Sequence, residues 1–129
     1  MLALAVALSL AVAVDAKALT FFQSQSRNIG CVISKRGVRC DIAERDWRPP
    51  PKPASCPVDW GQGLTVGRRG RARFVCAGDT VLGMGRRLQY GRSIRRGRFR
   101  CTSRRKGMHC VNRRNAHGFQ LSRERARRF

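Results

Sequence analysis

The cysteine pattern constrains this chain most, because the spacing Cys-x5-Gly-x2-Cys occurs twice. The first copy runs from Cys31 to Cys40 and the second from Cys101 to Cys110. In both copies the glycine can take the positive φ that a hairpin bend often requires. The repeat therefore predicts two β-hairpins, each closed by its own disulfide. In the first hairpin, the register that places Cys31 opposite Cys40 also places Ile33 opposite Val38.

The remaining cysteines, Cys56 and Cys76, pair with each other by elimination. An even number of cysteines, six, favours an oxidising compartment and three disulfides over a cytosolic metal site. Structural zinc is disfavoured because no Cys-x2-Cys occurs and the histidines, His109 and His117, do not follow a finger spacing. We expect no metal and no cofactor.

The N-terminus has the composition of an export signal. An apolar run from Leu2 to Val14 precedes small residues suited to cleavage after Ala16 or Ala18, although the usual basic start is missing. The run is shorter than the roughly 20 residues of a membrane span. We therefore predict a signal peptide over residues 1–18 and one disulfide-stabilised basic domain over residues 19–129.

Alternating hydrophobic residues predict an all-β or β-rich domain, a small antiparallel sheet of disulfide-stapled hairpins. The hairpin arms are expected at residues 28–33, 37–42, 98–103 and 107–112, and further strands at residues 19–23, 64–67, 72–77 and 115–121. Period two points Phe74 and Cys76 inward in one of these strands, and Phe119 and Leu121 inward in another.

Other segments are expected outside the strands. Residues 41–47 have room for one helical turn, which the prolines of residues 49–53 would end in an extended connector. A loop is expected over residues 90–97. Ser122 suits the N-cap of a short C-terminal helix that runs through Arg128.

The charge is strongly positive and lies mainly in the C-terminal half. The chain has 28 Lys and Arg against seven Asp and Glu, a net charge of +21. From Thr65 onward, 20 cations face two acids, which gives +18. Such a field attracts polyanions: nucleic acid, anionic lipid headgroups or acidic envelope polymers. The alternative is that arginine richness reflects coding bias and serves only solubility.

Arginine pairs at predicted turns are the candidate polyanion-binding residues. They would bind phosphates without reading sequence, because no base-reading helix or aromatic stripe is visible. The pairs chosen are Arg95, Arg96, Arg104, Arg105, Arg113 and Arg114.

The two histidines suggest a competing hypothesis, a basic ribonuclease, since histidine pairs can transfer protons at a phosphodiester. No further catalytic constellation accompanies His109 and His117, so we assign no catalytic residues. We expect His117 to bond a neighbouring backbone group at a tight turn before Gly118. Asp79 and Thr80 are interpreted as a hydrogen-bonded turn rather than a calcium site.

The order of motifs resembles a family of small exported actinobacterial proteins catalogued only as a domain of unknown function. The residues that carry the resemblance include Asn28-Ile29, Gly37 to Ile42, Trp47 with Pro49 to Pro51, Phe74 to Thr80, Tyr90-Gly91, Cys101 to Cys110, and His117 to Phe119. The resemblance implies export and a cysteine-rich β-fold, and it implies no activity. The chain departs at Gln25-Ser26-Arg27, where the resemblance implies Pro-Ser-Gly.

The sequence thus favours a monomeric protein, secreted or held in the cell envelope, that binds polyanions without catalysis. A structural or partner-binding exported protein is the alternative, and a basic hydrolase is a third hypothesis. Specific partners cannot be identified from these residues.

Overall fold

The computed structural model describes residues 18–129. The predicted signal peptide therefore lies outside the described residues, except for Ala18. Within residues 18–129 no helix is long and apolar enough to cross a membrane.

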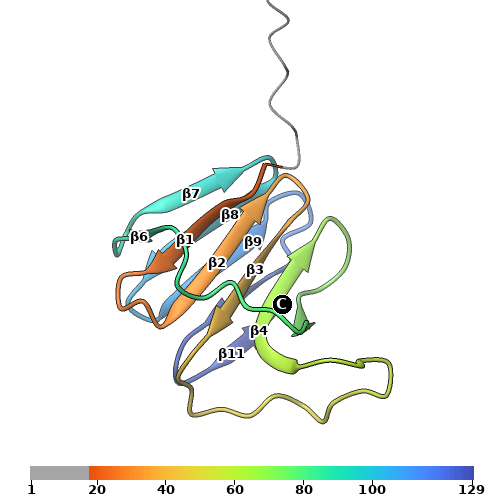
Figure 1. Cartoon of the computed structure of the whole chain (residues 1–129). Helices are drawn as coiled ribbons and strands as arrows, with labels where there is room; N and C mark the ends of the chain where they lie inside the picture. The colour runs from red at the N-terminus through yellow and green to blue at the C-terminus, as the bar shows by residue number, and fades with distance from the viewer. Residues whose placement is uncertain (1–17) are drawn as a thin grey trace, which may run out of the picture.

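The described chain is all-β, which confirms the predicted fold class, and its strands form two sheets (Figure 1). The strands are β1 (Thr20–Ser24), β2 (Ile29–Ser34), β3 (Gly37–Ile42), β4 (Trp60–Gly67), β5 (Arg73–Cys76), β6 (Arg86–Leu88), β7 (Ser93–Arg96), β8 (Phe99–Arg104), β9 (Gly107–Asn112), β10 (Gly118–Leu121) and β11 (Ala126–Arg128). Sheet A has the order β5-β4-β3-β2-β1-β6, and sheet B has the order β11-β10-β9-β8-β7. All neighbours are antiparallel except β1 and β6, which are parallel.

The two predicted hairpins are confirmed in position and register. Cys31 lies opposite Cys40 in β2 and β3, and Ile33 lies opposite Val38. Cys101 lies opposite Cys110 in β8 and β9. The three disulfides join the same pairs that the repeat and elimination predict, Cys31–Cys40, Cys101–Cys110 and Cys56–Cys76.

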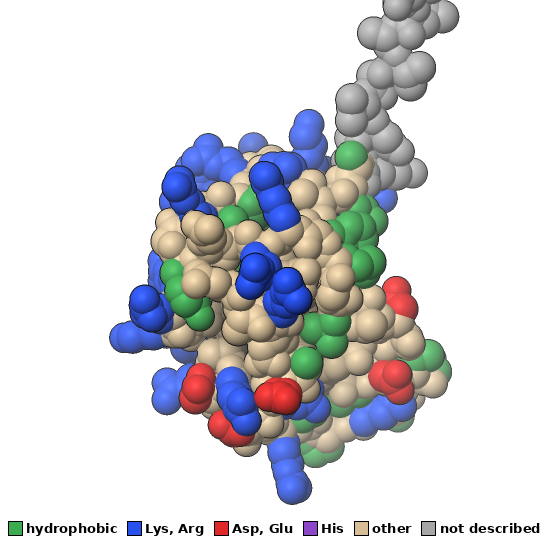
Figure 2. All heavy atoms as spheres, turned by 60° about the vertical axis from the view of Figure 1, so that its left-hand side comes forward, with side chains coloured by type: hydrophobic (Ala, Val, Ile, Leu, Met, Phe, Trp, Pro, Cys, Tyr) green, Lys and Arg blue, Asp and Glu red, His purple; other side chains and the backbone are tan. Residues whose placement is uncertain are grey.

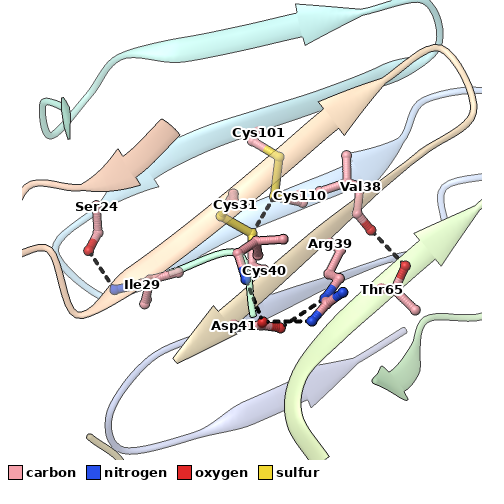
Figure 3. Close-up of a disulfide and its surroundings, with 11 residues drawn as sticks. Ser24, Ile29, Cys31, Val38, Arg39, Cys40, Asp41, Thr65, Cys101 and Cys110 are labelled. Carbon is pink, nitrogen blue, oxygen red and sulfur yellow. Dashed lines mark hydrogen bonds and ion pairs between the residues drawn. A yellow bond between two sulfur atoms is a disulfide. The ribbon is translucent and has the colours of Figure 1, made fainter. Parts of the chain in front are cut away.

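The hydrophobic core lies between the two sheets, and the two hairpin disulfides meet in it (Figure 3). The sulfur atoms of Cys40 and Cys110 are 3.9 Å apart, although one belongs to each sheet. Three fully buried aromatic side chains, Phe22, Phe99 and Phe119, belong to the same core cluster as these cysteines. Each hairpin has therefore placed its disulfide on the inward face of its own sheet.

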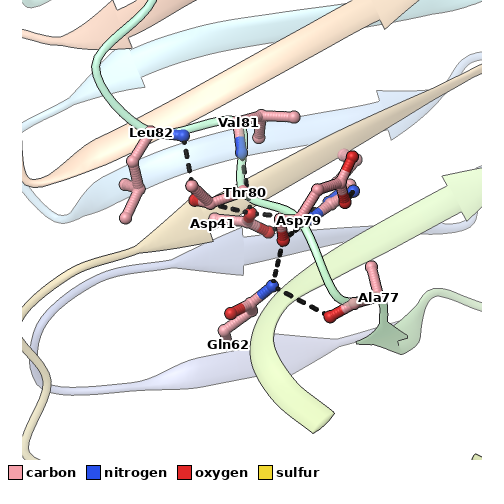
Figure 4. Close-up of polar contacts among 8 residues, drawn as sticks. Asp41, Gln62, Ala77, Asp79, Thr80, Val81 and Leu82 are labelled. Carbon is pink, nitrogen blue, oxygen red and sulfur yellow. Dashed lines mark hydrogen bonds and ion pairs between the residues drawn. The ribbon is translucent and has the colours of Figure 1, made fainter. Parts of the chain in front are cut away.

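A long crossing segment, residues 77–85, covers the outer face of sheet A on its way from β5 to β6 (Figure 4). It is attached to Asp41, an outward residue of β3 that is fully buried under the segment. The Asp41 carboxylate accepts hydrogen bonds from the Val81 amide at 3.0 Å and the Thr80 hydroxyl at 3.3 Å. It also pairs with Arg39 at 2.9 Å. The crossing segment brings β6 beside β1 in parallel, a pairing that the sequence did not indicate.

Several local expectations are wrong. In β5 the buried residue is Val75, whereas Cys76 is exposed and Phe74 is half-buried. Phe74 does pack against the core, as expected, and it also lies against Trp47 and Trp60, with ring centroids 6.1 and 6.0 Å away.

The expected loop and helices are also replaced. Part of residues 90–97 forms β7, because edge pairing with β8 satisfies its backbone. No helical turn forms over residues 41–47, where β3 extends to Ile42. The expected C-terminal helix is absent: the hydroxyl of Ser122 bonds Arg125 across a turn, and the chain returns as β11 against β10.

The turn between β1 and β2 contains an unusual backbone conformation. Arg27 has a φ of 67°, in the left-handed region that favours glycine. This is the position at which the family resemblance implies glycine and the chain has arginine. The Arg27 amide donates to the Ser24 carbonyl at 3.0 Å, so the turn closes despite the side chain.

Candidate anion-binding face and end cavity

Sheet B has one face toward the core and one face toward solvent, and successive residues of each strand alternate between the two faces. In β8 and β9, Phe99, Cys101, Met108 and Cys110 point inward and are buried. The residues between them therefore point outward. The resulting surface, hereafter the outer face, carries five exposed arginines: Arg95, Arg100, Arg104, Arg125 and Arg127.

These arginines have no carboxylate partners. Within residues 18–129, the ion pairs join acidic side chains only to Arg39 and Arg123. With strands about 4.8 Å apart, the five strands of sheet B spread the charge over about 19 Å. The outer face therefore presents guanidinium groups that are free to bind anions.

A basic groove runs along one margin of the outer face, with a volume of ≈ 580 Å³. Its cations are Arg104, Lys106, Arg125 and Arg127, and its one carboxylate belongs to Glu124. The β8–β9 turn forms one side of the groove and the β10–β11 turn the other. The groove gathers cations that are more than 20 residues apart in the sequence.

His109 lies at the centre of the outer face, in the cross-strand row that joins Thr102, His109 and Gln120. Burial lowers the pKa of its imidazole, and the charges of Arg104 and Arg127 lower it further, while the Gln120 side chain, as an acceptor for the imidazole N–H, raises it. The Nδ1 atom is buried without a hydrogen-bond partner. The ring stacks on Phe129, whose centroid is 5.6 Å away. The surroundings thus favour a neutral imidazole in a positive field.

The six candidate arginines are divided among several places. Arg95 and Arg104 belong to the outer face. Arg105, in the β8–β9 turn, lies over the Tyr90 ring, 5.1 Å from its centroid. Arg96 donates from Nε to the Thr20 hydroxyl at 3.3 Å, at the junction between the sheets.

Arg113 and Arg114 lie in the β9–β10 turn, at the opposite end of sheet B from Arg104. There Arg114 is close to Arg98 and Arg68. Burial lowers the pKa of Arg98, and the charges of Arg114 and Arg68 lower it further. This end is therefore a second positive region, separate from the groove.

The expected turn bond of His117 is not present. The turn before β10 is held by Asn115, whose side-chain oxygen accepts from the His117 amide at 3.0 Å, and by Asn112, which accepts from the Arg114 amide. The imidazole of His117 makes no hydrogen bond to another residue of the described chain.

Asp79 does lie in a turn, as expected. Its carboxylate accepts a hydrogen bond from Arg39 at 3.0 Å, which lowers the pKa of the Asp79 carboxyl.

A separate cavity of ≈ 330 Å³, hereafter the end cavity, opens at one end of the two sheets. The β1–β2 turn, the β8–β9 hairpin and the β10–β11 turn surround it. Its lining includes buried Ile29 and Met108, and the exposed side chains of Arg104, Arg105 and Glu124.

Figure 2 shows lysine and arginine side chains over much of the visible surface, with acidic side chains gathered in its lower part.

Comparison with protein families shows the family of the chain. The model of a family of unknown function, DUF6636, matches residues 2–129. The chain belongs to this family. No curated protein and no solved structure matches the chain. Membership of DUF6636 confirms the resemblance to a domain of unknown function and carries no activity with it.

The sequence reasoning missed Arg100, Arg125 and Arg127 as members of the basic surface. Arg100 precedes Cys101 directly, so alternation in the predicted hairpin already placed it outward. Residues two apart, such as Arg125 and Arg127, lie on one face of an extended segment but not of a helix. Because a helix was expected here, the two arginines were not grouped.

Proposed function

We propose that this protein binds anionic polymers, without catalysis, through the outer face of sheet B. The observation that carries the proposal is the set of five exposed arginines that share this face without carboxylate partners. Arginine forms strong charge-assisted hydrogen bonds with phosphate and carboxylate groups. Arginines spread over several strands suit an extended chain of charges better than a single small anion.

The proposal includes export to an oxidising compartment. Three disulfides are compatible with an extracellular or envelope location, where anionic polymers are accessible. The Cα atoms of the three cysteine pairs are 4.1 to 5.9 Å apart, so the backbone holds each pair within bonding reach.

The histidine arrangement gives little support to a hydrolase. His117 precedes β10, three residues before Gln120, which is the partner of His109 across the strands. Three strand residues span about 10 Å. The two imidazoles therefore lack the shared position that acid and base catalysis of one bond requires.

A charge-matched pair of variants tests the proposal. The face variant replaces Arg100, Arg104, Arg125 and Arg127 with Gln. The control variant replaces Arg36, Arg48, Arg86 and Arg87, exposed arginines of sheet A and its connections, with Gln. Affinity for polyphosphate and for duplex DNA is measured across a salt series.

We expect the face variant to bind both polymers more weakly and to reduce the salt slope by about one for each phosphate that it no longer neutralises. The control variant has the same net charge, and its affinity should fall much less. Equal decreases in the two variants would show that net charge alone drives binding, and the proposed face would be wrong.

A further inference from the structure

The end cavity is lined by a serine hydroxyl that has no hydrogen-bond partner in the described chain. Ser103 lines the cavity although only 1% of the residue is exposed. Its backbone groups bond to Arg92 and Gly91, but its hydroxyl makes no hydrogen bond to any other described residue. The hydroxyl is therefore available to a ligand as donor and as acceptor. A ligand hydroxyl in the cavity would supply the missing bond.

The neighbouring serine hydroxyls already have partners. Ser24 accepts from the Ile29 amide at 3.0 Å, and Ser122 accepts from the Arg125 amide at 3.1 Å. These two bonds shape the turns that form the walls. Ser103 is thus distinguished from both, because it points into the same cavity and takes no part in holding its walls.

The charged groups at the rim are unevenly paired. Arg123 contacts Glu44 at 3.2 Å and Asp46 at 3.6 Å, so its charge is compensated. Arg104 and Arg105 have no such partner in the described chain, and Arg105 covers the Tyr90 ring. The rim can therefore receive an anionic group, while the Glu124 carboxylate can accept a hydrogen bond from a ligand hydroxyl.

The end cavity adjoins the basic groove. Arg104, Ser122 and Glu124 line both. A polymer lying in the groove can therefore place one of its units in the cavity. The unit must carry several hydroxyls and an acidic group, and its ring must suit the apolar surface of Ile29 and Met108.

We propose that the end cavity binds one acidic sugar unit, of the hexuronic acid class, of an anionic polysaccharide whose next units follow the basic groove. This inference rests on the proposed function and narrows its ligand. A sugar acid provides hydroxyls for Ser103 and Glu124 and a carboxylate for Arg105. A nucleobase fits less well, since Arg105 already occupies the Tyr90 face on which a base would stack.

Two substitutions in the cavity test the inference. Ser103→Ala removes the unpartnered hydroxyl, and Arg105→Gln removes the charge over Tyr90. Ser55→Ala and Arg36→Gln are the matched controls, because both residues are exposed and neither lines the cavity or the groove. The probe is tetragalacturonate, compared by calorimetry with maltotetraose, which is neutral, and with a short single-stranded oligonucleotide of the same charge.

We expect tetragalacturonate to bind more tightly than maltotetraose or the oligonucleotide. Each cavity variant should weaken this binding by about three- to tenfold, the loss of one hydrogen bond. Both controls should bind as the wild type does. The melting temperature of the Ser103→Ala variant should not fall, because its hydroxyl makes no bond in the free protein.

The outcomes separate the two proposals. If the cavity variants bind tetragalacturonate normally, or if the oligonucleotide binds as tightly, the sugar-acid inference is wrong. If the face variant still binds polyphosphate more weakly in that case, the proposed function stands. If the cavity variants no longer bind tetragalacturonate while the face variant binds polyphosphate normally, the proposed function fails and the cavity site remains.

Discussion

Asp41 shows how one side chain can hold a segment in place. Its carboxylate lies on the outer face of sheet A, where a residue would ordinarily meet water, yet it is fully buried. Arg39 supplies the compensating charge through Nε and Nη2, at 3.1 and 2.9 Å. Because hydrogen bonds to a buried charge are stronger than neutral ones, the crossing segment is fastened at Thr80 and Val81.

We predict that Asp41→Asn lowers the free energy of unfolding by about 3 kcal/mol or more, since it removes the charge that compensates Arg39 in a partly buried site. Asp79→Asn is the control. Asp79 also pairs with Arg39, but its side chain is 78% exposed, so the decrease should be much smaller than that of Asp41→Asn. Urea unfolding of the oxidised proteins measures both. Similar decreases in the two variants would contradict the role assigned to Asp41.

At the scale of elements, the crossing segment depends on glycine in the strands beneath it. A Cβ built on Gly30 would lie 2.5 Å from the Val81 carbonyl oxygen and 2.7 Å from the Leu82 Cα. Both are backbone atoms, which cannot move without displacing the segment. The close approach of the segment to β2 therefore requires a residue without a side chain at position 30.

Gly30→Ala should lift the crossing segment from sheet A while the two hairpins remain paired. We expect faster hydrogen exchange at the Val81 amide, with little change at amides of β8 and β9. Gly67→Ala is the matched control, because a Cβ there meets nothing within 4 Å and its φ is not in the left-handed region. Unchanged protection of Val81 in the Gly30 variant would show that the segment is held without this close approach.

The elements predicted correctly from sequence are those whose partners are close along the chain. The Cys31–Cys40 hairpin is specified by its own cysteines and glycine, and so is the second hairpin. Strands β6 and β7 escaped prediction because their partners, β1 and β8, decide their conformation, and the β1 partner is distant in sequence. The helix expected after Ser122 failed because local capping chemistry also suits a tight turn between strands.

At the scale of the whole molecule, folding changes the arrangement of charge that the sequence already carries. Composition predicted a polyanion-binding protein, and it could not select the arginines concerned. Arg100 and Arg127 lie on one surface only because β8, β9, β10 and β11 form consecutive strands of sheet B. The end cavity has the same origin, since three turns from different parts of the chain surround it.

The final prediction separates folded arrangement from composition. The face variant and the control variant each lack four arginines, so they differ only in where the charges were. In the oxidised protein we expect the face variant to bind polyphosphate more weakly than the control. After reduction, in urea sufficient for complete unfolding, the strands no longer gather Arg100 and Arg127 on one surface. The two variants should then bind equally, as fluorescence anisotropy at matched salt can measure. A difference that survives unfolding would place the effect in the local sequence around these arginines, and sheet B would not be its cause.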